Sequence, residues 1–362
     1  MISCHTKVGP RFVGGTILRA LFLPPFAWQP YNNAYSADSG PSPFEIYEVL
    51  AKRGIQSEIL DPHKRPLNPF SGRDTLLDSL DPTRALRVLT RRRDVDIVVS
   101  VGEGAAVPLV LAKRSFAFRP PIVIWDPSLT ESWRLRERML DIALPRVDGV
   151  MVLGENQVSY IEKRWHPRST PRVIYHHVDA NFFAPGPDAA DEYILSVGDD
   201  VGRDFETLIR AVEGSPRHIK IKTRRPVSSS PTLGPGVEII SERITYRELR
   251  ALYSRCSFVV VPLKQTINAS GVSTILEAGA MGKALIVSDN SAISDYIVPG
   301  ETCLTVPCDN SAALRAAIER LSSDRDLRDQ LGSAARSFVT SRFANRPFAE
   351  GLASVLTEYA RQ

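Results

Sequence analysis

Cysteine is scarce in this chain of 362 residues, and its few thiols lie far apart. The four cysteines are Cys4, Cys256, Cys303 and Cys308, with no C-x-x-C pair among them and no histidine cluster nearby. The spacing therefore favours neither a structural zinc site nor a disulfide framework. Reduced thiols are typical of cytoplasmic proteins, and we expect that compartment here.

Long apolar runs are also missing. No stretch approaches the roughly 20 apolar residues that a membrane-spanning helix requires. Residues 1–18 lack the continuous apolar segment of a secretory signal. We therefore expect a cytoplasmic protein for which any membrane contact is peripheral.

Net charge is modest, with a formal value of +4 and an isoelectric point near 8.9. The excess comes from arginine clusters at 91–93 and 134–138. Such clusters are typical of solvated helix faces, although they would also suit an anionic small ligand or membrane surface. They match no nucleic-acid-binding motif, so we expect no nucleic-acid partner.

What is present is the composition of a globular protein, with 43% hydrophobic and 24% charged residues. Single hydrophobic cores stop growing at about 250 to 300 residues. The length therefore favours two domains, with a cleft between them.

Strands and helices alternate through the first half of the sequence. Apolar runs that suit strands occur at 19–23, 55–60, 96–101, 121–125 and 149–153, and helical spacing occurs at 44–53, 105–114 and 131–143. Continuous apolar strands of this kind are buried on both faces, and strands separated by helices form right-handed βαβ units. We expect one doubly wound parallel sheet.

The same pattern restarts after a segment rich in Pro, Gly, Ala and acidic residues at 184–192. Strand-like runs at 193–197, 218–223, 237–240, 258–263, 284–288 and 304–306 alternate with helical spacing at 204–213, 245–254 and 273–281. The predicted organisation is an N-terminal extension (1–18), two Rossmann-like domains (19–185 and 192–340) and a C-terminal helix (341–362) that packs back on the first domain.

Most candidate ligand-binding residues lie in the segment 268–289, NASGVSTILEAGAMGKALIVSD. In this segment a glycine follows a strand and begins a helix. The free N–H groups of a helix N-terminus bind a diphosphate well, so Ser270, Gly271 and Val272 are candidate ligands. Gly271 lets the backbone approach the ligand closely. Glu277, about one turn inside the helix, is placed to accept hydrogen bonds from both ribose hydroxyls.

The string LEAGAMGKALIVSD resembles the signature of the large family 4 of retaining glycosyltransferases. The segment SVGDDVGRDFETLIRAV at 196–212 resembles the strand, glycine-rich turn and helix of the same family. The resemblance implies the GT-B fold, in which two Rossmann-like doubly wound sheets face a central cleft. It also implies retaining transfer from a nucleoside-diphosphate sugar, with UDP or GDP as the carrier and no further cofactor. We expect this transfer to be metal-independent, because no credible carboxylate pair follows a strand and the donor site has Arg203 and a helix N-terminus.

The resemblance assigns roles to individual residues. Glu277 holds the donor ribose, Gly198 lies in the turn, and Arg203 takes the place of a lysine on the donor diphosphate, where an arginine fork can neutralise the leaving group. The base is expected beside Arg243 and Ile244. The C-terminal half then binds the donor, and the N-terminal half selects an acceptor glycan, lipid or small molecule.

Further candidates follow other strands. Lys264 is a second candidate for the diphosphate, and Asp126, at the end of PIVIWD, is a candidate catalytic contact to acceptor or donor sugar, because open α/β sheets bind ligands at strand C-termini. A turn aspartate is an equal interpretation of Asp126. His176 and His177 could line the cleft, but adjacent histidines at a strand end are more often structural.

The sequence departs from the family pattern at two positions. Asp199 stands where an arginine usually follows the first glycine, and Ala269 stands where the first glutamate of an E-x₇-E pair contacts the transferred sugar. A nucleotide-sugar 2-epimerase on the same scaffold and a non-catalytic partner subunit therefore stay open as alternatives.

Two other motifs are rejected. The Asp94-Val95-Asp96 triplet imitates a D-x-D metal motif, but it precedes its strand, and we expect no metal site. Gly102-Glu103-Gly104 is half of a G-x-G-x-x-G motif with valine in the third position, which argues against a dinucleotide oxidoreductase.

Overall fold

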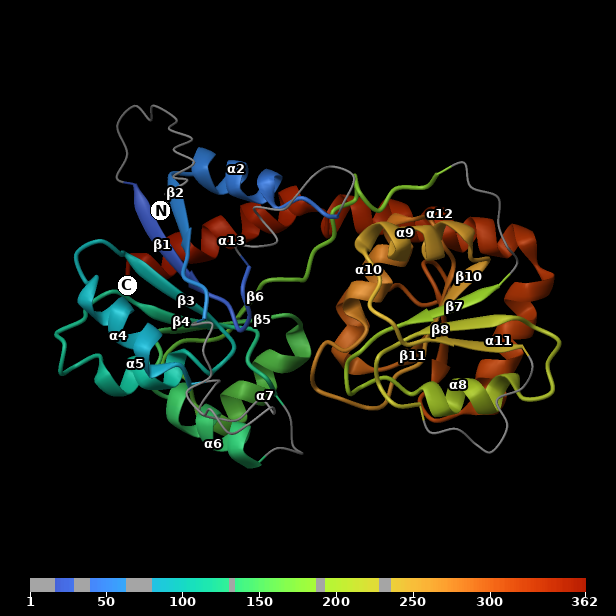
Figure 1. Ribbon diagram of the computed structural model, residues 1–362, viewed down its shortest axis with the longest axis horizontal. Helices are drawn as coiled ribbons and strands as arrows, with labels where there is room; N and C mark the ends of the chain where they lie inside the picture. The colour runs from blue at the N-terminus through green and yellow to red at the C-terminus, as the bar shows by residue number, and fades with distance from the viewer. Residues whose placement is uncertain (1–16, 29–39, 63–79, 130–133, 187–192, 228–235) are drawn as a thin grey trace.

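The computed structural model describes residues 17–28, 40–62, 80–129, 134–186, 193–227 and 236–362, and it contains two separate β-sheets (Figure 1). Each sheet has six described strands, and every neighbouring pair of those strands runs parallel. The fold class expected from the sequence, α/β with two doubly wound parallel sheets, is confirmed.

The first sheet has the strand order β2-β1-β3-β4-β5-β6. Its strands are β1 (Leu18–Leu23), β2 (Ile55–Ile59), β3 (Ile97–Val101), β4 (Ile122–Trp125), β5 (Gly149–Val152) and β6 (Arg172–Val173). The helices of this half are α2 (Phe44–Lys52), α4 (Pro82–Thr90), α5 (Ala106–Ala112), α6 (Arg134–Ala143) and α7 (Glu155–Trp165).

The second sheet has the strand order β12-β11-β10-β7-β8-β9. Its strands are β7 (Ile194–Val197), β8 (Ile219–Lys222), β9 (Val237–Ile240), β10 (Phe258–Val261), β11 (Leu285–Asp289) and β12 (Leu304–Pro307). The helices that follow β7 are α8 (Phe205–Val212), α9 (Tyr246–Arg255), α10 (Val272–Ala280), the 3₁₀ helix η1 (Ser291–Tyr296), α11 (Ser311–Ser323), α12 (Arg325–Arg342) and α13 (Asn345–Ala360).

Both faces of each sheet are covered, which explains why the central strands are mostly apolar, whereas β2, β8 and β9 also contain polar residues. In the first sheet, alternate residues pack in two cores, one against α4 to α7 and the other against α2 and α13. In the second sheet one core includes α9 and α10, and the other includes α8 and α11.

Helix α13 comes last in the chain but packs on the first sheet. Phe348, Leu352 and Leu356 of α13 are buried together with Phe22 and Val99 of β1 and β3. In Figure 1 this helix, drawn in red, runs across to the side of the molecule that holds β1. The chain therefore passes between the two sheets twice.

Direct hydrogen bonds join the two halves. The Leu129 amide donates to Asn268 Oδ1 at 3.1 Å, and Asn156 Nδ2 donates to the Ile267 carbonyl at 3.0 Å. The Tyr296 hydroxyl donates to the Leu153 carbonyl. The loops after β4 and β5 and the start of α7 thus rest against the segment that precedes α10 and against η1.

The strands predicted from apolar runs all occur, with bounds that differ by a residue or two. Helices α4 and α7 were not predicted. The expected linker at 184–192 lies partly outside the described residues. Within the described residues, no helix is long and apolar enough to cross a membrane.

Candidate functional site

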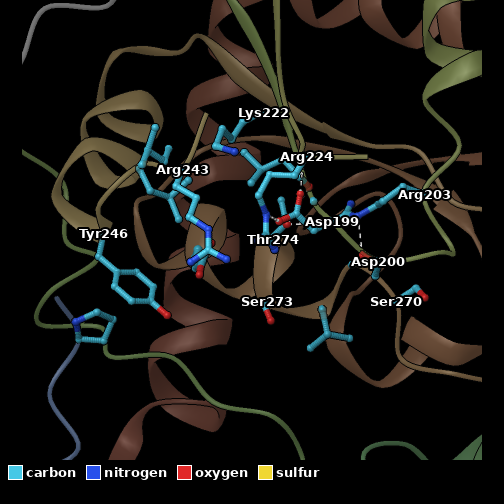
Figure 2. A pocket seen from close by; sticks show the side chains of 18 of the residues that line it. Asp199, Asp200, Arg203, Lys222, Arg224, Arg243, Tyr246, Ser270, Ser273 and Thr274 are labelled. Carbon is cyan, nitrogen blue, oxygen red and sulfur yellow. Dashed lines mark hydrogen bonds and ion pairs between the residues drawn. The ribbon is translucent and has the colours of Figure 1, made fainter. Parts of the chain in front are cut away.

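A pocket of about 950 Å³ lies at the C-terminal ends of β7, β8, β9 and β10 (Figure 2). Four basic and three acidic side chains line it: Arg203, Lys222, Arg224, Arg243, Asp199, Asp200 and Glu277. Gly40 and Pro41 of the first half contribute to its wall, where a Cβ on Gly40 would lie 3.1 Å from the ring of Tyr246. The pocket is therefore shaped by both halves of the chain.

The N-terminus of α10 opens into this pocket. Gly271 is the N-cap residue, with φ of 84°, and no side chain caps the helix. A Cβ on Gly271 would lie 2.9 Å from Val261 Cγ1 and 3.0 Å from Leu263 Cδ2, so the turn also needs glycine for space. Because the first amides of a helix have no intrahelical partner, this end offers donors and partial positive charge to an anion.

Glu277 lies in the second turn of α10, as its sixth residue, and lines the same pocket. The buried Tyr253 hydroxyl donates to Glu277 Oε2 at 2.8 Å. Desolvation raises the pKa of Glu277 to about 7, although the Tyr253 hydrogen bond and the charge of Arg203 act in the opposite direction. Near neutral pH this carboxyl group exchanges between its acid and carboxylate forms.

Arg203 reaches the pocket but is almost fully enclosed, with 5% of the residue exposed. Its Nε donates to Asp200 Oδ2 at 2.8 Å and its Nη2 donates to Thr274 Oγ1 at 2.6 Å. Its Nη1 is buried without a hydrogen-bond partner and lies on the side of Gly271. The guanidinium group therefore ties the loop after β7 to the first turn of α10.

A second group of charges follows β7 and β8. The Nε of Arg224 donates to Asp199 Oδ2 at 2.5 Å, and its backbone amide donates to Asp199 Oδ1 at 2.7 Å. Figure 2 shows this contact, with Lys222 on the same side of the pocket. Burial acts to raise the pKa of Asp199, but the bonds from Arg224 and the charges of Arg224 and Lys222 outweigh it, so the pKa is lowered.

The far rim is built by the start of α9. Thr245 is its N-cap residue and forms a capping box with Glu248. This cap fixes the preceding residues Arg243 and Ile244, which line the pocket. Arg243 is exposed, so its long side chain is accessible to a ligand.

Most sequence-predicted residues of the donor site line this one pocket: Gly198, Arg203, Arg243, Ile244, Ser270, Gly271, Val272 and Glu277. Lys264 is not among the lining residues. Its side chain is exposed, and its backbone is held by the Gly202 carbonyl and by Asn290. Lys264 lies in the loop after β10, whereas the pocket is lined by residues 269–274 further along the same connection.

Asp126 is also outside the pocket lining, in the loop after β4 that crosses toward Asn268. It adopts the left-handed conformation, with φ of 53°, which is uncommon for a residue with a side chain. Its side chain is accessible, yet close protein atoms desolvate it and Glu103 adds a like charge, so its pKa rises to about 6. A strained carboxyl group with a raised pKa is typical of functional sites.

The two histidines differ in their surroundings. His176 Nε2 lies 3.1 Å from Ser273 Oγ, and Ser273 lines the pocket. His177 Nδ1 lies 3.0 Å from Asn345 Oδ1, and its ring stacks on Phe348 of α13. Desolvation is the main cause that lowers the pKa values, to about 3 for His176 and about 4 for His177, so both rings are neutral at pH 7.

Several lining residues escaped the sequence analysis, namely Lys222, Arg224, Tyr246, Ser273 and Thr274. A signal for the first two was present, because the strand HIKIKT ends in two further arginines, Arg224 and Arg225, at the edge where parallel sheets bind ligands. Within the described residues, no group of three or more His, Cys, Asp or Glu side chains is placed to hold a metal ion.

Solved structures share this architecture over nearly the whole chain. Sucrose-phosphate synthase from Thermosynechococcus elongatus is 18% identical with a TM-score of 0.72, covering 95% of this chain and 100% of that one. A glycosyltransferase from Rickettsia africae is 14% identical with a TM-score of 0.68, covering 96% and 99%. HepE from Anabaena, solved with UDP and glucose, is 14% identical with a TM-score of 0.67, covering 94% and 99%. The chain therefore has the GT-B fold.

At the level of sequence, residues 233–338 match the family described as glycosyl transferases group 1. The matched stretch contains Arg243, the N-terminus of α10 and Glu277. No curated protein sequence matches the chain.

Proposed function

We propose that this protein transfers a sugar from a nucleoside-diphosphate sugar to an acceptor bound between its two halves, with retention at the anomeric carbon. The observation that carries the proposal is the convergence of Glu277, the uncapped N-terminus of α10 and four basic side chains on one pocket. A carboxyl group of this kind recognises a ribose, and a helix N-terminus with basic side chains recognises a negatively charged diphosphate.

Each part of the donor meets a different element. The ribose hydroxyls donate to Glu277 in its carboxylate form, and the base lies at the rim beside Arg243 and Ile244. The diphosphate accepts hydrogen bonds from backbone amides near Ser270, Gly271 and Val272. The family match at 233–338 and the UDP and glucose complex of HepE support UDP as the first carrier to test and GDP as the second.

Arg203 acts mainly as a positioning residue. It holds Asp200 and Thr274 and therefore fixes the loop and the helix end that surround the diphosphate. Its positive charge lies beside Gly271 and stabilises the negative charge that grows on the leaving diphosphate as the glycosidic bond breaks.

The first half selects the acceptor. Asp126 lies in a loop that reaches the segment before α10, so its carboxyl group can contact a hydroxyl of the acceptor or of the transferred sugar. Asp126 follows β4 directly, and its backbone has a left-handed conformation that fixes the orientation of this side chain. In this proposal the donor domain corresponds to 192–340 and the acceptor domain to 19–185.

A screen of thermal stability against UDP-, GDP- and ADP-sugars tests the donor site, followed by product analysis with the stabilising donor. A rise in Tm with one nucleotide series, and a glycosylated product that forms only with acceptor present, would support the proposal. An epimerised nucleotide sugar formed from the donor alone would show the epimerase instead. No binding to any nucleotide would favour a non-catalytic subunit.

A further inference from the structure

Lys222 is a buried cation without a partner. It ends β8, only 7% of its surface is exposed, and it lines the pocket. Its ammonium group has no hydrogen bond and no ion pair within the described residues, and its charge helps to lower the pKa of Asp199. Buried charges in proteins are normally paired, so an unpaired ammonium facing a cavity indicates that its anion comes from a ligand.

Arg224 adds a second cation two residues further along the chain. Asp199 accepts from its Nε and from its backbone amide, which fixes the guanidinium plane. The two terminal nitrogens of Arg224 have no partner in the described part of the chain, and the side chain is 49% exposed and lines the pocket. A guanidinium held by Nε presents its remaining fork to an anion.

These cations are connected to the helix end by a short series of contacts. Arg224 binds Asp199, the adjacent Asp200 binds Arg203, and Arg203 lies against Gly271. The loop that carries the two aspartates packs closely on the start of α10, since a Cβ on Gly202 would lie 2.3 Å from Ser270 Oγ. Lys222, Arg224 and the first amides of α10 thus line the same end of the pocket.

We propose that Lys222 and Arg224, with Asp199 as the clamp that orients Arg224, form the cationic half of the diphosphate site. Asp199 alone would repel a diphosphate. Paired with Arg224, Asp199 becomes part of the site. The positive charge that an arginine directly after Gly198 would provide comes here from Lys222 and Arg224, at the end of the neighbouring strand β8. This inference rests on the proposed function for the identity of the nucleotide, but not for the presence of an anion site.

Calorimetric titration tests the assignment. UDP and uridine are titrated separately into wild type, Lys222→Met and Arg224→Ala. If GDP is the better ligand, GDP and guanosine replace them. Each variant should weaken nucleoside-diphosphate binding tenfold or more and change nucleoside binding less than twofold. Arg225→Ala is the matched control, because Arg225 is a neighbouring exposed arginine outside the pocket lining, and it should alter neither. Equal losses for diphosphate and nucleoside would overturn the assignment.

The role of Asp199 has its own readout. In the Arg224→Ala variant Asp199 faces the diphosphate as an unpaired carboxylate. Adding Asp199→Ala should therefore raise the affinity for the nucleoside diphosphate at least threefold above that of Arg224→Ala alone. The same change in wild type should not improve binding. Absence of rescue would remove Asp199 from the proposal.

Inorganic pyrophosphate separates this inference from the proposed function. It should raise the Tm of wild type and Arg225→Ala but not of Lys222→Met, even if no nucleotide binds. Lys222→Met should also raise the Tm of the free protein, because methionine removes an unpaired buried charge at similar volume. Equal stabilisation of Lys222→Met and wild type by pyrophosphate would contradict the anion site while leaving a nucleotide site intact.

Discussion

Glu277 connects nucleotide binding to pH. Its pKa of about 7 means that at pH 6 most molecules carry the neutral acid, which accepts hydrogen bonds from ribose hydroxyls less well than the carboxylate does. We expect UDP to bind about tenfold more weakly at pH 6 than at pH 8, and calorimetric titration measures this directly. The Glu277→Gln variant should bind weakly at both values, because it has no group to ionise.

The control lies in the comparison of the two proteins. The nucleotide phosphate also titrates near pH 6, but it does so equally for wild type and for Glu277→Gln. Glutamine can still accept the hydrogen bond of Tyr253, so the fold is kept. A pH dependence of the same size in both proteins would place the titration on the nucleotide and not on Glu277.

The stability of the free protein should have the opposite pH dependence. The folded-state pKa of Glu277 is raised above its ordinary value of 4.5, so between these values the folded protein binds more protons than the unfolded chain. The contribution of this group to the free energy of unfolding therefore decreases as the pH rises from about 4.5 to about 7 and is constant above that. Glu277→Gln should lack this decrease in urea unfolding.

The sequence could predict single residues only where a local pattern defined them. Glu277 and Gly271 follow from a strand, a glycine and a helix in order. The enclosure of Arg203 could not be predicted in this way, because Thr274 stands 71 residues away in the chain. Lys222 and Arg224 were missed because their role depends on Asp199. This residue follows the neighbouring strand β7 and, taken alone, is only a departure from the family pattern.

The start of α10 depends on a glycine in two separate respects. Gly271 has a positive φ, and a side chain there would also collide with Val261 and Leu263. We expect Gly271→Ala to lower the free energy of unfolding by about 3 kcal/mol, as the sum of left-handed strain and overpacking. Urea unfolding measures this loss, and the displaced helix end should also weaken pyrophosphate binding.

Gly214 offers the matched control for that change. Its φ is 71°, but nothing lies within 4 Å of the position of its Cβ. Gly214→Ala should therefore show the conformational strain alone, about 1 kcal/mol, with unchanged ligand binding. If both alanine variants lost the same stability, crowding at Gly271 would not contribute.

Helices and strands were predictable from the sequence where apolar periodicity was strong. Strands β4, β5 and β10 are continuous apolar runs, whereas β2, β8 and β9 also contain polar residues. Helix α4 was missed because it is short and polar on its outer face, with Asp81 capping it in a left-handed conformation. Helix α7 was missed because its acidic and basic residues obscure the buried face that includes Ile161 and Trp165.

At the scale of the whole molecule, the proposed function predicts activity without a metal ion. In the proposed function the leaving diphosphate is stabilised by the helix end, Lys222, Arg224 and Arg203, whose combined charge replaces that of a divalent cation. Activity should therefore persist in excess chelator. Its complete loss, with restoration by Mg²⁺ or Mn²⁺, would refute this electrostatic account.

The arrangement of the two sheets followed from the sequence, since each βαβ series must form its own parallel sheet. The docking of the loops after β4 and β5 on the segment before α10 and on η1 could not be predicted in this way. Those contacts involve backbone groups and side chains such as Asn268 and Tyr296, which have no periodicity to reveal them.

The packing of α13 on the first sheet determines when this sheet can complete its folding during protein synthesis. The ribosome completes β5 roughly 200 residues before it completes α13, and at about 5 to 20 residues per second this interval lasts ten seconds or more. Throughout that interval the sheet face that includes Phe22 and Val99 lacks the helix that covers it. The nascent first half therefore exposes this apolar sheet face until α13 has emerged from the ribosome.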